Sequence, residues 1–181
     1  MGSDAGKSHD SYTVTPAPPL RPSDAVDVRD DRPAGATPLQ VDAGALDVAI
    51  AAAGVTVSAS TVIKLRLRPQ TQPGQQGSAR RLGADQYRIV VHVATKPAFT
   101  DHHLYVVNNS LLHELRHVAQ MQHDPDHAAS YAHQNLTVGY TANTYEVEAR
   151  YWGRLADHTG DKDTGPAGAH LGKQVWALRP A

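Results

Sequence analysis

The chain contains no cysteine. Disulfide bonds are therefore excluded, and any bound zinc must be held by nitrogen and oxygen atoms only. Closed structural zinc sites usually contain thiolates, so the absence of cysteine favours a metal site of the open, catalytic kind.

Excess charge of one sign and long apolar runs are also missing. The 181 residues have a formal net charge of −1 and a pI near 6.8, so we expect no general attraction to nucleic acid or to anionic membranes. No apolar run reaches the length of a membrane span, and the first residues lack the apolar core of a secretory signal. We therefore expect a soluble protein, cytoplasmic by default, with no nucleic-acid and no membrane partner.

Large apolar residues are scarce in residues 1–37, which are rich in Pro, Asp, Ser and Gly. Such a composition buries too little apolar surface to offset the entropy that is lost on ordering. We predict that residues 1–37 form a Pro-rich arm that is disordered or is ordered only by a protein partner. Residues 38–181 are then expected to form one domain, because about 140 residues are enough for a single core.

Helical and extended patterns alternate in the rest of the chain. Asp42 is placed to cap a helix over 43–53, which Gly54 would end. Residues 55–67 are rich in β-branched side chains and end in an alternation of charged and apolar ones, and residues 87–94 form a second such run, which predicts two strands paired antiparallel. These patterns predict an α+β fold with a small, mainly antiparallel sheet.

Three further segments lack a strong periodic pattern. Residues 69–83 combine Gly, Pro and Gln, which predicts a long polar loop. Residues 123–141 are interpreted as a second loop. Residues 175–178 are short and apolar, which predicts an edge strand or a hydrophobic patch.

Glutamate is nearly absent as well: the chain has 15 aspartates but only three glutamates. One of them is Glu114, because residues 113–117 read H-E-L-R-H within a helix predicted over 108–122. His113 and His117 then share one helix face a turn apart and can hold one metal ion, with Glu114 beside the open position as general base. A solvated, charged helix is the competing interpretation, but the surrounding leucines have buried-helix spacing. The pattern therefore predicts a catalytic zinc site.

Two histidines and a water leave a zinc site one protein ligand short. The two remaining glutamates, Glu146 and Glu148, stand near the start of a helix predicted over 143–158. Either can supply the missing carboxylate. Weaker candidates are the histidines of the preceding loop, His133, His127 and His123.

Glu146 has two competing roles. On a helix, Glu146 shares a face with Ala149 and Gly153, which are small enough for a close approach to the helix that carries the histidines. That arrangement would make Glu146 a metal ligand. Alternatively, Glu146 stands three residues after Asn143 and would complete a capping box for its own helix, without any metal.

H-E-x-x-H followed by E-x-E-A on a later helix resembles the gluzincin branch of the zincin metallopeptidases. The resemblance covers residues 108–156, and the run 116–120 is also similar to that of small bacterial and phage-encoded metallopeptidases. It implies a zincin-like domain in which a sheet packs on the motif helix, with Zn²⁺ as cofactor and a protein or peptide as substrate. The ligand role carries over to Glu146, the first glutamate of E-x-E-A.

One position departs from the gluzincin pattern. Many members have an acidic or amide residue four positions after the ligand glutamate, where it supports a zinc histidine; here that position is Arg150. A guanidinium cannot accept the imidazole proton. Arg150 is therefore expected to orient Glu146 or Glu148, or to bind a substrate carboxylate.

The resemblance implies hydrolysis of a peptide bond by a metal-activated water. Glu114 would take the proton of the water and pass it to the leaving nitrogen. The oxyanion needs a second donor besides zinc, for which the candidates are Tyr140, Tyr131 and His133.

A structural or assembly protein is the alternative function. It would be built on a zincin scaffold, within a phage particle, with a structural or vestigial metal site, and its arm would contact a partner. This alternative implies association with a virion. The intact Glu114 favours the enzyme, because a structural site does not need a base.

Overall fold

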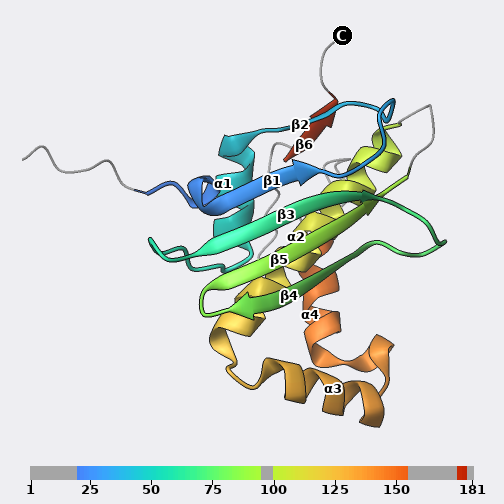
Figure 1. Ribbon diagram of the computed structural model, residues 1–181. Coiled ribbons are helices and arrows are strands. Elements are labelled where there is room, and N and C mark those ends of the chain that lie inside the picture. The colour runs from blue at the N-terminus through green and yellow to red at the C-terminus, as the bar shows by residue number, and fades with distance from the viewer. Residues whose placement is uncertain (1–19, 95–99, 155–174, 179–181) are drawn as a thin grey trace, which may run out of the picture.

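A four-stranded sheet is the base on which the other elements are arranged (Figure 1). The computed structural model describes residues 20–94, 100–154 and 175–178. Helices and a small mixed sheet together make an α+β fold, as predicted. In chain order the elements are η1 (Pro22–Ala25), β1 (Val26–Asp30), β2 (Leu39–Val41), α1 (Ala43–Ala52), β3 (Val62–Pro69), β4 (Gly77–Gly83), β5 (Gln86–Val93), α2 (Asp101–His123), α3 (His127–Thr137), η2 (Tyr140–Ala142), α4 (Thr144–Gly153) and β6 (Trp176–Leu178).

The strand order of this sheet is β1-β3-β5-β4, and only β4 runs antiparallel to its neighbour. The prediction that residues 55–67 and 87–94 pair antiparallel is therefore wrong, and the sheet is mixed. The reason is that residues 77–83, which were predicted as loop, form β4. After β3 the chain crosses to the edge of the sheet and forms β4, then turns and returns as β5 between β3 and β4. Since β4 and β5 are antiparallel, β3 and β5 point the same way.

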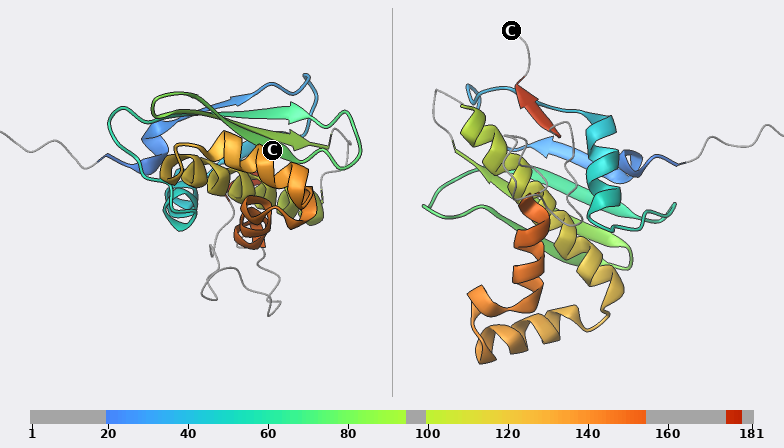
Figure 2. Two further views of the ribbon diagram at one scale, coloured as in Figure 1. Left: turned by 90° about the horizontal axis from the view of Figure 1, so that it is seen from below. Right: turned by 180° about the vertical axis from the view of Figure 1, so that it is seen from behind.

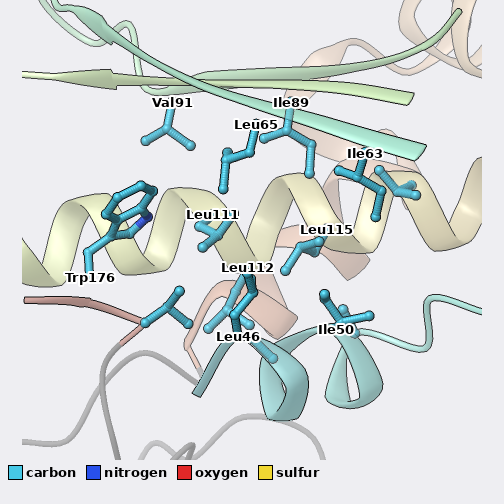
Figure 3. Close-up of a cluster of buried hydrophobic side chains, with 14 of the residues drawn as sticks. Leu46, Ile50, Ile63, Leu65, Ile89, Val91, Leu111, Leu112, Leu115 and Trp176 are labelled. Atoms are coloured by element: carbon cyan, nitrogen blue, oxygen red, sulfur yellow. The ribbon is translucent and has the colours of Figure 1, made fainter. Parts of the chain in front are cut away.

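Alternation in β3 places one face of the sheet in the core. Ile63, Leu65 and Leu67 are buried, as predicted, while the charged side chains between them remain on the other face. All four described α-helices lie on the buried face (Figure 2, left). Figure 3 shows side chains of the sheet and of α1 meeting Leu111 and Leu112 of α2. Each buried leucine contributes roughly 1.5–3 kcal/mol, so this cluster holds α2 against the sheet.

The helix α1 begins and ends where the sequence predicts. The Asp42 carboxylate accepts a hydrogen bond from the Ala45 N–H at 2.8 Å, which caps the first turn. Gly54 follows the last turn with a φ of +77°, a conformation that side chains with a Cβ rarely adopt.

Part of the segment predicted as an arm belongs to the sheet. Residues 26–30 form β1, which pairs parallel with β3, and the Arg66 guanidinium lies 2.7 Å from the Asp27 carboxylate. Only two of the five β1 residues are apolar, so composition alone does not reveal the strand. Residues 20–25 and 31–37 of the predicted arm are also described, with η1 among them, and residues 1–19 lie outside the described residues.

The helices after β5 also differ from the prediction. The helix α2 begins at Asp101, seven residues earlier than predicted, after Thr100 as cap. Residues 127–137, predicted as loop, form α3, which has no buried residue in the described structure and so lacks the apolar stripe that reveals a packed helix. α4 begins after Asn143 as predicted, and its predicted continuation over 155–158 lies outside the described residues.

Residues 176–178 form the edge strand β6, which pairs antiparallel with β2. The Asn108 amide of α2 donates to the Trp176 carbonyl and accepts from the Trp176 N–H at 2.8 Å, so β6 is held against the motif helix. Trp176 is 2% exposed and completes the core. Among the described helices, none combines the length and the apolar character that crossing a bilayer requires.

Candidate metal centre

Three side chains from two helices converge on one point. His113 and His117 lie one turn apart on α2, and their Nε2 atoms are 3.1 Å apart. Glu146 of α4 places its two carboxylate oxygens 3.4 Å from His113 Nε2 and 3.3 Å from His117 Nε2. Ligand atoms at the usual zinc distances in a tetrahedral site are roughly 3.3 Å apart. The two Nε2 atoms have about this separation, and one ligand atom from each of the three residues lies within 4.8 Å of the others, so this triangle can surround one metal ion.

Small residues bring α4 close enough for this triangle to form. Ala149 is fully buried, and a Cβ added to Gly153 would lie 3.1 to 3.2 Å from atoms of Asn109 on α2. Figure 2 (right) shows α4 crossing α2. Glu146 lies on the same buried face of α4 as these two residues, as the sequence predicted.

Helix capping does not explain the position of Glu146. The Asn143 side chain accepts from the Tyr145 N–H at 3.0 Å, so α4 is capped without the glutamate. Glu146 is 2% exposed and points instead at the two histidines.

The chemistry of Glu146 fits a metal ligand. Its Oε1 accepts a hydrogen bond from the Tyr131 hydroxyl at 2.6 Å, whereas its Oε2 is buried and makes no hydrogen bond within the described part of the chain. Burial alone would raise the pKa of Glu146, but the neighbouring histidines and tyrosines outweigh it and hold the pKa well below its usual value. A buried carboxylate oxygen without a hydrogen bond is costly, and a bound cation would offset that cost.

Glu114 is buried beside the triangle, beneath the edge strand β4. It is 5% exposed, and a Cβ added to Gly77 of β4 would lie only 2.7 Å from its Oε1. Burial raises the pKa of Glu114 to about 8, and the Glu146 carboxylate adds to this effect while His117 opposes it. A carboxyl group with a pKa near neutrality is suited to taking up and releasing a proton.

The contact between Gly77 and Glu114 allows a matched test. We expect Gly77→Ala to lower the free energy of unfolding by about 1–3 kcal/mol, because the added methyl group overlaps Glu114 and the Val90 carbonyl. Gly83→Ala on the same strand should leave the free energy of unfolding unchanged or slightly raised, since a Cβ added to Gly83 meets no described atom within 4 Å. Urea denaturation of both variants measures the difference, and equal stabilities would contradict the close packing at Gly77.

The triangle opens into a cleft of about 530 Å³. Residues 77–81 of β4 form one wall, the motif helix forms the floor, and α3 and η2 form the other wall. The cleft thus joins the metal ligands and Glu114 to a sheet edge. Besides residues 77–81, the cleft is lined by side chains of α2, α3 and η2 and by Glu146 of α4, among them His113, Glu114, His117, Met121, His127, Tyr131 and Tyr140.

Two of the three predicted oxyanion donors reach this cleft. Tyr131 and Tyr140 both line it, and Tyr131 already donates to Glu146. Burial, together with a hydrogen bond to Glu146, raises the pKa of Tyr140 to about 12, so its hydroxyl keeps its proton at neutral pH. His133 is exposed on α3, outside the residues that line the cleft.

The alternative histidine ligands lie outside the triangle. His127 lines the cleft with its ring 6.3 Å from that of His117, and its buried Nε2 has no hydrogen-bond partner among the described residues. His123 donates from Nδ1 to the Ala119 carbonyl at 2.7 Å. His127 is therefore a cleft residue, and no sequence signal separates it from His133.

Glu148 and Arg150 have different surroundings from Glu146. The Glu148 carboxylate pairs with the Arg116 guanidinium and accepts from the Gln120 amide at 2.7 Å, away from the two histidines. The Arg150 guanidinium lies 3.8 Å from Glu146 Oε2 and donates to the Thr141 carbonyl. Of the roles expected for Arg150, the structure places it where it can orient Glu146.

Sequence reasoning missed Gln120. Its Oε1 lies 2.7 Å from His117 Nδ1, so an amide supports one of the two histidines. The signal was present in the sequence, since Gln120 stands three residues after His117 and so on the same helix face.

Comparison of the chain with protein-family models, with curated proteins and with solved structures found no match.

Proposed function

We propose that this protein is a zinc-dependent metallopeptidase in which His113, His117 and Glu146 hold the metal and Glu114 is the general base. The triangle of ligand groups carries the proposal: the two Nε2 atoms are 3.1 Å apart, and each has one oxygen of the Glu146 carboxylate within 3.4 Å. Its supporting feature is that Glu114 is buried in the same cleft. A structural site has no use for such a carboxyl group.

Each residue of the cleft has a role in this reaction. A bound Zn²⁺ would supply a Lewis acid that polarises the scissile carbonyl and makes a water acidic. Glu114 takes the proton of the attacking water and passes it to the leaving nitrogen. Glu146 contributes the negative charge of the ligand set, and Tyr131 holds its carboxylate in place. Tyr140, which retains its proton, is the donor for the oxyanion.

The free edge of β4 supports a peptide as the substrate. Gln76 stands opposite His92, whose N–H donates to the Gln76 carbonyl at 2.7 Å. Bonded and non-bonded pairs alternate in an antiparallel ladder, so the backbone groups of Gly77 and Ala79 point away from β5. These groups lie at the wall of the cleft, where an extended peptide can pair with them.

Metal analysis combined with a peptide-library cleavage assay tests the proposal. We expect one zinc ion per chain, and cleavage that a chelator abolishes and added Zn²⁺ restores. Stoichiometric zinc without turnover would favour the assembly protein with a structural metal site instead. Absence of both zinc binding and cleavage would refute the metallopeptidase.

A further inference from the structure

We infer that Gln120 is a positioning residue that fixes the tautomer of His117. Through hydrogen bonds to Glu148, and from Glu148 to Arg116, it also connects His117 to the neighbouring helices. The expected effect of Gln120 on zinc affinity rests on the proposed function. The hydrogen bonds that carry the inference belong to the metal-free chain and can be tested there.

The orientation of the Gln120 amide follows from its neighbours. Its Nε2 lies 2.7 Å from the Glu148 carboxylate and 3.0 Å from the Tyr145 carbonyl. Both groups only accept hydrogen bonds, so the NH₂ side of the amide must face them and uses both of its hydrogens there. The Gln120 oxygen is thereby turned toward His117.

The tautomer of His117 follows from the amide orientation. The Gln120 oxygen lies 2.7 Å from His117 Nδ1 and can only accept, so Nδ1 must carry the hydrogen. In a neutral imidazole the other nitrogen, Nε2, then keeps a free lone pair. That nitrogen is the one that faces His113 and Glu146. Gln120 therefore presents His117 in the form that a metal requires.

Arg116 anchors the outer end of this chain of contacts. Its guanidinium donates to the Glu148 carboxylate and, at 2.9 Å, to the Ala53 carbonyl at the end of α1. It also lies 5.0 Å from the centre of the Trp152 ring. Arg116 thus bonds one oxygen of the Glu148 carboxylate and fixes its orientation, so the other oxygen is in place to accept from Gln120.

These contacts give the three glutamates of the chain three separate roles. Glu114 is the base, Glu146 is a ligand, and Glu148 orients Gln120. The acceptor for His117 comes from the motif helix itself, as an amide one turn beyond it. Loss of such a supporting group typically weakens metal binding 10–100-fold.

Two readouts test the role of Gln120. In metal-free protein, at a pH high enough for the His117 imidazole to be neutral, two-bond ¹H–¹⁵N NMR correlations should show the Nδ1–H tautomer. Gln120→Leu should shift it toward the Nε2–H form. Competition with a chromophoric chelator should show that Gln120→Leu binds Zn²⁺ about 10–100-fold more weakly than the wild type. A purely structural role would change stability and leave the tautomer as it is.

Two further variants serve as controls. Gln122→Leu removes an amide of the same helix that bonds the Thr56 backbone and, among the described residues, no part of the metal centre, and it should leave both readouts unchanged. The double variant Gln120→Glu/Glu148→Gln exchanges acceptor and donor between the two positions at constant charge. It should restore the Nδ1–H tautomer and most of the zinc affinity.

Unchanged tautomer and zinc affinity in folded Gln120→Leu would overturn the inference. If the wild type binds no zinc, the proposed function fails, and the tautomer of His117 in the wild type and in Gln120→Leu still decides the role of Gln120. Failure of the double variant to restore the tautomer would also count against the hydrogen-bond polarity described above.

Discussion

Glu114→Gln is expected to lower peptide hydrolysis by a factor of about 10² to 10⁴ while the protein keeps its zinc. The amide has the size of the carboxyl group, so it fits the space beneath Gly77 that a larger side chain would overfill. It cannot take the proton of the attacking water. Since Glu114 is not part of the ligand triangle, the metal should remain. Hydrolysis rate and zinc content, measured on the same samples, separate loss of the base from loss of the metal.

A control for Glu114→Gln removes a different carboxylate near the cleft. Asp126 is exposed and precedes His127, which lines the cleft. Asp126→Asn makes the same exchange of a carboxyl group for an amide but touches neither ligand nor base, so hydrolysis should stay within about twofold of the wild type, as expected for a screened surface charge. If Glu114→Gln retained comparable hydrolysis, Glu114 would not be the base.

Removal of Glu146 is expected to abolish both zinc binding and hydrolysis. Glu146→Ala leaves two neutral imidazoles in place of a charged, three-membered ligand set. The loss of zinc affinity should exceed the roughly 100-fold that is typical for a supporting group. His117→Ala should have the same outcome, because it removes a corner of the same triangle. Competition with a chelator and metal analysis after gel filtration measure both variants.

Glu148→Ala is the matched comparison for Glu146→Ala. It removes the other glutamate of the same helix, which contacts Arg116 and Gln120 but not the histidines. Zinc should remain at one ion per chain. Its affinity should fall by no more than the roughly 10–100-fold expected when the Gln120 amide is no longer oriented. Unchanged zinc affinity in the double variant Glu146→Ala/Glu148→Ala would exclude both glutamates as ligands.

Elements that carry their own local signals were predicted well, except that β3 begins at Val62 and not at residue 55. α1 has a capping Asp42 and a terminating Gly54, and β3 alternates charged and buried side chains. These signals depend on residues a few positions apart, so the sequence displays them directly. The H-E-x-x-H geometry belongs to the same class, because helical periodicity alone brings His113 and His117 together.

The missed elements depend on distant partners. β4 is rich in Gly and Arg and is held by its pairing with β5, and β1 joins the sheet beside β3 although most of its side chains are polar. α3 has no buried residue among those described, so no apolar stripe marks it. The parallel pairing of β3 and β5 also depends on β4, which explains why the error in one strand changed the predicted topology.

By itself, the sequence determined the candidate chemistry: nitrogen and oxygen ligands only, two histidines at helical spacing, a base between them, and a third ligand limited to very few residues. Only the tertiary structure decided among those few. Glu146 and Glu148 are two positions apart, about 200° around the helix axis, so the approach of α4 to α2 determines which one meets the histidines. That approach depends on Ala149 and Gly153 packing against a helix distant in the sequence, and local patterns do not contain such a contact.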